Sequence, residues 1–161
     1  MTRILPLLAA VAALAIPTTL LAASASDGTL SVKRGRAAIV LKLRGTAIGS
    51  IAIGSVKIRD LTPFTGSSPR FRHCRILRPI SASTTLCKGR KISFRAPDGP
   101  YVVTAKGVGI FLSAVGRGTV TFDGTGDATH PNGLMSFDDG PYLPIPDEPT
   151  SYSLGTATAG N

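Results

Sequence analysis

The sequence lacks tryptophan and has only two cysteines, two histidines and nine acidic residues among 161 positions. It contains no Gly-x-Ser-x-Gly nucleophile elbow, no Walker phosphate loop, no His-Glu-x-x-His zinc motif and no Ser-x-x-Lys pair. The cysteines do not form a Cys-x-x-Cys motif, and there is no second cysteine pair to complete a zinc site. These absences exclude the enzyme classes that such motifs identify. We therefore expect no motif-defined catalytic residue, no metal site and no cofactor.

Acidic residues and histidines give only weak signals of chemistry. The run from Asp123 to Asp127 (Asp-Gly-Thr-Gly-Asp) places two carboxylates close together, as a calcium loop would. It lacks the residue order of an EF-hand, and glycine and aspartate are also common turn residues, so a turn is the preferred interpretation. His73 lies among arginines, which oppose metal binding. Asp138 and Asp139 are sequence neighbours, whereas glycoside cleavage needs two acids facing each other across a cleft.

One long apolar run occurs, near the N-terminus. Arg3 precedes an apolar stretch that ends at Leu21, and Ala23-Ser24-Ala25 matches a signal-peptidase cleavage site. A membrane anchor is the alternative, but two prolines inside the run disfavour a long helix. We expect residues 1–25 to be a secretory signal peptide. The remainder, residues 26–161, then forms one exported domain with no later transmembrane segment.

Cys74 and Cys87 are the only cysteines. In an exported protein an isolated pair is most simply one disulfide, because the compartment is oxidising. Closing a loop of this length contributes about 3 kcal/mol in the chain-entropy model. We expect a structural disulfide that closes a connector spanning residues 61–91.

The segments 30–60 and 92–123 have similar patterns. A shift of 62 positions aligns them without a gap through most of their length and places Gly45 on Gly107. Apolar residues alternate with polar ones, β-branched residues are frequent and helix caps are missing, all of which indicate strands. The sequence predicts an all-β fold: an antiparallel sandwich or barrel built from two similar four-strand units, produced by internal duplication, plus a C-terminal hairpin.

Turns are expected at three glycine-containing sites. Arg34-Gly35-Arg36 is expected to turn the chain in the first unit. Pro97-Asp98-Gly99-Pro100 is expected to close a hairpin in the second, since Asp-Gly between alternating apolar runs favours a tight turn. Asp138-Asp139-Gly140-Pro141 is expected to close the C-terminal hairpin, and Tyr152 and Leu154 to lie in a last short strand.

Charge is the strongest compositional signal. Residues 26–106 contain 16 basic and 3 acidic side chains, whereas residues 107–161 contain 1 basic and 6 acidic ones. A positive surface attracts anionic polymers. The alternatives are that the two halves neutralise each other within the molecule, or that the charge only maintains solubility. The densest basic run flanks the cysteines, and its candidate anion-binding residues are Arg70, Arg72, Arg75, Arg78, Lys88, Arg90 and Lys91.

The expected partner is an anionic cell-wall polymer or lipid headgroups. Nucleic-acid sites combine cations with stacking aromatic side chains. Here only Phe71 and Phe94 lie near the basic run in the sequence. Specific nucleic-acid recognition is therefore not expected.

Several short motifs allow a resemblance to be named. They are Gly-Thr-Ala-Ile-Gly (45–49), Lys-Gly-Val-Gly-Ile (106–110), Val-Gly-Arg-Gly-Thr-Val (115–120) and Asp-Asp-Gly-Pro-Tyr (138–142). With the export signal, an excess of Arg over Lys and few Asn or Gln, the chain resembles small secreted β-proteins of high-GC Gram-positive bacteria. The resemblance implies an exported β-domain and supplies no activity or site residue.

The leading hypothesis is a non-enzymatic secreted or cell-envelope-associated binding domain. One alternative is a secreted hydrolase or lyase whose carboxylates come from separate strands. Another is a protease-inhibitor module that presents the Cys74–Cys87 loop. Converging carboxylates in a deep pocket would favour the enzyme, whereas a filled core with a shallow basic surface would favour the binding domain.

Overall fold

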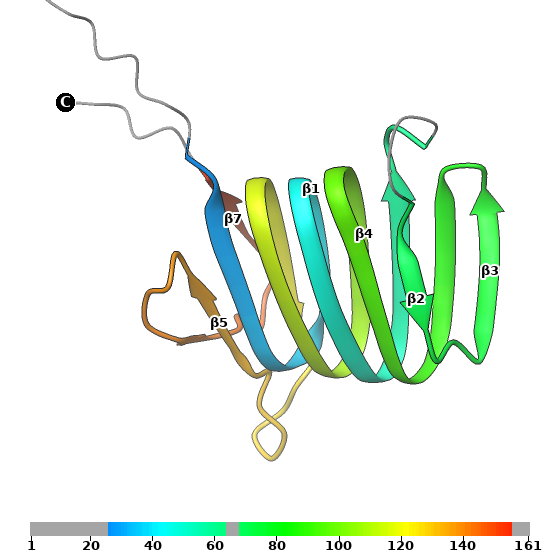
Figure 1. The fold of residues 1–161 in the computed structure, drawn as a ribbon. Helices are drawn as coiled ribbons and strands as arrows, with labels where there is room; N and C mark the ends of the chain where they lie inside the picture. The colour runs from blue at the N-terminus through cyan, green and yellow to red at the C-terminus, as the bar shows by residue number, and fades with distance from the viewer. Residues whose placement is uncertain (1–25, 64–67, 156–161) are drawn as a thin grey trace, which may run out of the picture.

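Two very long strands dominate the computed structural model, which describes residues 26–63 and 68–155. β1 (Gly28–Asp60) has 33 residues and β4 (Thr84–Gly124) has 41. They are antiparallel and wind around a common axis as interleaved turns of one spiral (Figure 1). Five short strands complete a seven-stranded antiparallel sheet: β2 (Arg70–Arg72), β3 (Ile76–Ser81), β5 (Leu134–Phe137), β6 (Leu143–Pro144) and β7 (Thr150–Leu154).

The all-β antiparallel class is thus confirmed. These two ranges contain no helix that is long and apolar enough to cross a bilayer. The proposed signal peptide, residues 1–25, lies outside the described residues.

The spiral arises because β1 pairs with β4 along both of its edges. Leu41 pairs with Val103 on one side and with Val120 on the other, and Val103 also pairs with Ile58. A strand therefore advances 17 residues in most turns, as from Leu41 to Ile58, before it returns to the same side of the spiral. The first part of β4 advances 18, as from Cys87 to Ala105. One such turn rises by two strand spacings, about 10 Å. Both edges of both strands are hydrogen-bonded over most of their length, and the sheet spirals instead of closing on itself.

The core lies along the axis of the spiral. Phe122, Ile39, Ala105, Val56 and Cys87 pair in succession across the sheet, and each is at most 1% exposed. Burying a large aliphatic or aromatic side chain of this kind contributes about 1.5–3 kcal/mol. Alternate residues along each strand point outward, so the charged side chains of β1 and β4 lie on the outer surface of the spiral, except Asp60, which is buried at the end of β1.

The alternation changes phase at a bulge in β1. Between Val32 and Gly35, β1 advances three residues while β4 advances only two, and Arg34 has a φ of 54°. The inward-facing residues shift from even to odd positions there. The expected turn at Arg34-Gly35-Arg36 is wrong, because the extra residue is absorbed as a bulge and the strand continues.

The hairpin expected at Pro97-Asp98-Gly99-Pro100 is also wrong. β4 runs through this segment, and both of its flanks pair with β1: Phe94 with Gly49, and Tyr101 with Leu43. An Asp-Gly turn forms a hairpin when the two flanking runs pair with each other. Here β1 is long enough to partner both, so the chain bends without reversing.

Each expected four-strand unit is in fact part of one continuous strand. Segment 30–60 lies within β1, and segment 92–123 lies within β4. The two segments also pair with each other. Their equivalence by superposition stays a prediction.

The C-terminal hairpin and the last strand are confirmed. Leu134 of β5 pairs with Pro144 of β6, and the connecting Asp138 and Asp139 have φ values of 49° and 55°. Tyr152 of β7 pairs with β4. The hairpin and β7 cover the spiral at the end where β1 begins (Figure 1).

Two cross-strand glycine pairs allow β1 and β4 to bend. Gly45 lies opposite Gly116, and Gly54 lies opposite Gly107. Their φ values fall between 144° and 157°, a region that residues with a side chain rarely adopt. A Cβ atom on Gly54 would also overlap the carbonyl oxygen of Lys106. Both the backbone conformation and the close approach therefore require glycine.

We expect Gly54→Ala to lower the free energy of unfolding by about 2 kcal/mol or more, because it adds backbone strain and a steric overlap. Urea titration measures the change. The neighbouring outward-facing Ser55→Ala is the control and should shift the unfolding free energy by less than about 0.5 kcal/mol. Equal unfolding midpoints for Gly54→Ala and the unaltered protein would refute the requirement for glycine.

Candidate functional site

The candidate site is the last turn of the spiral. β2 pairs with β4 at residues 93–95, and β3 pairs with β4 at residues 84–88. We call residues 70–81 together with 84–95 the basic end. It contains eight Lys or Arg residues and no Asp or Glu. All seven predicted anion-binding residues lie here, and Arg95 joins them.

The predicted disulfide is confirmed, and it fastens this turn to the core. The Cα atoms of Cys74 and Cys87 are 5.3 Å apart, and Cys87 is fully buried. The adjoining backbone then lies so close to β4 that a Cβ on Gly89 would be 2.9 Å from the Arg75 nitrogen and 3.1 Å from the His73 carbonyl oxygen. The disulfide therefore fixes the position from which Arg75 projects.

A groove of about 590 Å³, the basic groove, lies beside the disulfide. Its cationic residues are Arg75, Lys88 and Arg90, and its apolar residues include Ile53 and Ile76, which are 49% and 51% exposed. Each guanidinium group can donate two parallel hydrogen bonds to the oxygens of one carboxylate or phosphate, and the Lys88 ammonium adds a third positive charge. The remaining lining residues are His73, Cys74 and Gly89. The groove thus suits an anionic group attached to a partly apolar body.

A second hollow, of about 280 Å³, lies between Arg70, Arg72 and Arg95, and we call it the arginine hollow. Ser93 and Phe94 complete its lining. Arg70 lies directly opposite Arg95 across the β2–β4 pair, an arrangement of like charges that destabilises a sheet.

The predicted patch is therefore divided between the basic groove and the arginine hollow. Arg78 and Lys91 lie at the same end of the spiral but line neither of them. The basic end offers two separate places where an anionic group meets three cations.

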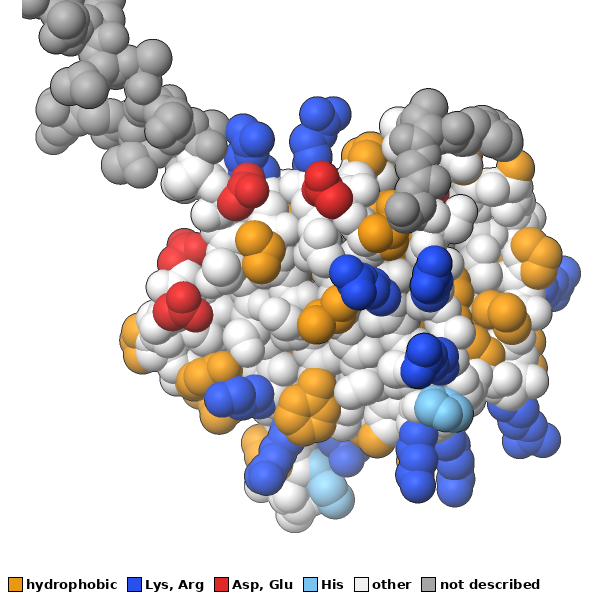
Figure 2. Space-filling view, in the orientation of Figure 1, with side chains coloured by type: hydrophobic (Ala, Val, Ile, Leu, Met, Phe, Trp, Pro, Cys, Tyr) orange, Lys and Arg blue, Asp and Glu red, His pale blue; other side chains and the backbone are white. Residues whose placement is uncertain are grey.

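The basic end has no internal counter-charge. Over residues 26–63 and 68–155, the single ion pair between a Lys or Arg and a carboxylate joins Arg117 to Asp27, at 3.2 Å. Figure 2 shows Lys and Arg over the part of the surface around β2 and β3, with the acidic side chains on this face gathered toward the opposite end. Among the described residues, no carboxylate of the acidic half forms an ion pair with these eight cations.

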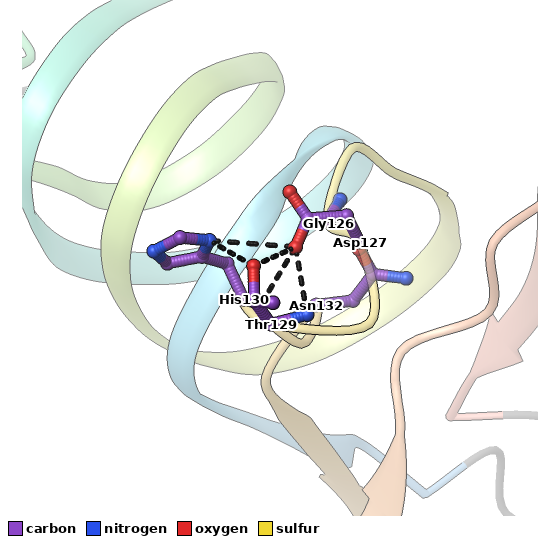
Figure 3. Close-up of polar contacts among 5 residues, drawn as sticks. All are labelled: Gly126, Asp127, Thr129, His130 and Asn132. Atoms are coloured by element: carbon purple, nitrogen blue, oxygen red, sulfur yellow. Dashed lines mark hydrogen bonds and ion pairs between the residues drawn. The ribbon is translucent and has the colours of Figure 1, made fainter.

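The Asp123–Asp127 run proves to lead from the end of β4 into a hydrogen-bonded loop. One carboxylate oxygen of Asp127, Oδ1, accepts hydrogen bonds from the Thr129 N–H (2.8 Å), the Thr129 hydroxyl (2.6 Å) and the His130 N–H (2.8 Å) (Figure 3). The Asn132 side chain accepts a bond from the Gly126 N–H at 2.5 Å. No group of three His, Cys, Asp or Glu side chains in the described ranges is placed to share a metal ion.

Asp127, Thr129 and His130 also lack the geometry of a catalytic relay. The Thr129 hydroxyl and the Asp127 carboxylate both contact the same ring nitrogen, Nδ1 of His130, at 2.8 and 3.4 Å. In a nucleophilic triad the acid and the nucleophile bind different nitrogens of the imidazole. The hydrogen bonds of this loop therefore serve to hold its shape.

Asp127 provides a test of that loop. Hydrogen bonds from the Thr129 hydroxyl and N–H, followed by that from the His130 N–H, hold the pKa of its carboxyl below the ordinary 3.8. A lowered pKa stabilises the fold above the unfolded-state value, and this contribution is lost as the pH falls through the folded-state pKa. We expect Thr129→Ala to raise the Asp127 pKa toward 3.8, and NMR titration of the carboxyl carbon measures it. Thr125→Ala is the control and should not move it. A wild-type titration at or above 3.8 would contradict the hydrogen-bond pattern.

Because Arg70 lies opposite Arg95, we expect the like charges of this pair to lower the free energy of unfolding. We expect Arg70→Glu to raise the free energy of unfolding by about 0.5–1 kcal/mol, because it places opposite charges across the β2–β4 pair. Arg78→Glu is the matched control, because it makes the same charge reversal on β3 opposite the uncharged Leu86. Chemical denaturation compares the two. If both variants change stability equally, the direct pair has no effect of its own.

The chain matches no protein-family model, and neither curated proteins nor solved structures show a significant match to it.

Proposed function

We propose that the protein is a non-enzymatic binding domain, secreted or associated with the cell envelope, whose basic end binds anionic groups on surface polymers or lipid headgroups. One observation carries this proposal: eight cations share one end of the spiral without a carboxylate partner among the described residues. Self-repulsion among them opposes folding. An anionic ligand removes that repulsion and so gains binding energy from it.

The construction of the basic end supports a binding role. The Cys74–Cys87 disulfide and the pairing of β2 and β3 with β4 hold the cations on one turn. A rigid array loses little conformational entropy when a ligand binds. Attraction to such an array is electrostatic and weakly selective, and it fades as salt shortens the Debye length from about 10 Å at 0.1 M to about 3 Å at 1 M.

An enzyme receives less support from the same surfaces. Among the residues that the structure describes, no carboxylate lines the basic groove or the arginine hollow, and Ser93 supplies the one hydroxyl group. The loop between the cysteines is a β-hairpin, in which Leu77 pairs with Cys87 and Ser81 with Thr84. The backbones of the two hairpin strands are thus hydrogen-bonded to each other, whereas an inhibitor loop leaves its backbone free to bind a protease.

The proposal is tested by retention of the purified protein on isolated cell wall and on an anionic resin across a salt series. We expect retention at low salt and release well below 1 M, because the charges act over the Debye length. We expect Arg75→Glu with Arg90→Glu, which reverses two charges of the basic groove, to abolish most of the retention.

Lys42→Glu with Arg44→Glu is the matched control, because it makes the same change in net charge on the outer surface of β1. This variant should retain more binding than the groove variant. Absence of retention at low salt overturns the proposal. An equal loss in both variants assigns binding to net charge alone and removes the basic end as the site.

A further inference from the structure

One face of the spiral carries two parallel rows of outward side chains, one across five strand segments and one across four. The first row leads from Arg70 and Arg95 across β1 and β4 and back to β1, and its residues are Arg70, Arg95, Ile48, Ser113 and Ser31. The second row begins at Arg72 and ends at an aromatic ring, and its residues are Arg72, Ser93, Ser50 and Phe111. We call the two rows together the track. With neighbouring strands about 4.8 Å apart, the first row is about 19 Å long.

Three hollows in the surface lie along the track, and neighbouring hollows share lining residues. The arginine hollow shares Phe94 with a groove of about 440 Å³ beside Ile48 and Phe111. That groove shares Ser31 and Ser113 with a third hollow of about 320 Å³, which reaches Tyr142. The three hollows together follow the track from β2 toward the β5–β6 hairpin.

The chemistry of the track changes along its length. Three arginines stand at one end, without an acidic neighbour in the arginine hollow. The middle presents two exposed apolar side chains, Ile48 (49%) and Phe111 (46%), between serine hydroxyls. At the far end Lys33 lies over the Tyr142 ring, 3.9 Å from its centroid, and the Tyr142 hydroxyl is hydrogen-bonded to the Ser31 hydroxyl. Asp139 also lines this third hollow, so the attraction for acid groups lies at the arginine end of the track.

A sugar ring has an apolar C–H face and an edge of hydroxyl groups, so it can stack on an exposed aromatic ring and hydrogen-bond to serines beside it. We propose that an acidic polysaccharide strand lies along the track, with acid groups at the arginine hollow and sugar rings on Phe111 and Ile48. This inference rests on the proposed function and names the class of polymer. A lipid surface needs a continuous apolar patch, whereas three arginines and four serines surround Ile48 and Phe111 on the track.

The test compares polymers of similar charge with and without sugar rings. Polygalacturonate is the polysaccharide probe and polyglutamate is the sugar-free polyanion, both at low salt with Kd measured by calorimetry or fluorescence anisotropy. Wild type should bind polygalacturonate more tightly. Phe111→Ala should weaken polygalacturonate binding about 2- to 12-fold, as expected for loss of one ring contact, and leave polyglutamate binding unchanged. Arg70→Gln with Arg95→Gln should weaken both.

Ile80→Ala is the matched control, because Ile80 is 55% exposed on β3 and lies off the track. It should change neither affinity. Thermal unfolding monitored by circular dichroism confirms that each variant is folded, and Ile48→Ala gives a second variant with the same expected selectivity.

The outcomes separate the two proposals. Failure of the wild type to bind either polyanion at low salt overturns the proposed function. Equal binding of both, unaffected by Phe111→Ala and Ile48→Ala, overturns the track and leaves the proposed function standing. Tight binding of a thymidine 20-mer that depends on Phe111 would identify a single-strand nucleic-acid surface instead. Preferential binding of phosphatidylglycerol vesicles that is lost in Ile80→Ala would identify a membrane-facing β3 edge, and would likewise overturn the track.

Discussion

Everything in this molecule depends on the pairing of β1 with β4 along both edges. A strand that is hydrogen-bonded on one edge only must find another partner or remain exposed. Here the same two strands supply both partners, since Leu41 reaches Val103 on one side and Val120 on the other. The spiral that results places alternate residues on its axis and all others on its surface. The buried core and the outer surface therefore both follow from the same alternation along β1 and β4. A change of register would move residues from one to the other.

The ends of the spiral are where this pairing stops, and they differ in how they are protected. At one end the β5–β6 hairpin and β7 cover the first turn, and Phe122, Phe137 and Tyr152 pack edge to face or tilted, with ring centroids 5.1–6.5 Å apart. At the other end, among the described strands, β3 pairs with β4 alone. An edge strand of this kind resists pairing with other chains when it carries proline and charge, as β3 does at Pro79 and Arg78. The positive charge of the basic end thus also guards the exposed edge.

Local sequence patterns correctly predicted the features that depend only on residues close together in the chain. The period-two alternation identified strands, the isolated cysteine pair identified the disulfide, and Asp138-Asp139-Gly140 identified the C-terminal turn. The predictions that were wrong concern features that depend on pairing with residues far away in the sequence. The Asp98-Gly99 turn was wrong because both of its flanks pair with β1, and the bulge at Arg34 shows itself only through its register with β4. The closeness of Phe111 to the arginines could not be predicted for the same reason. In the sequence Phe111 is far from the arginines, but the spiral places it two strand spacings from Ser93.

The spiral also explains how a small β-domain can present charge at a regular spacing. Lys88, Ser55 and Lys106 are consecutive partners across three strand segments, so the two lysines are held about 10 Å apart on the same face. Flexible polybasic segments must lose conformational entropy to match a polymer, whereas these cations project from a backbone that is already fixed on both edges. The arrangement costs stability through repulsion, and the buried axial core has to offset that cost before any ligand arrives. A long, doubly paired strand supplies such a core with few turns, which leaves the outer residues free to be chosen for what they bind.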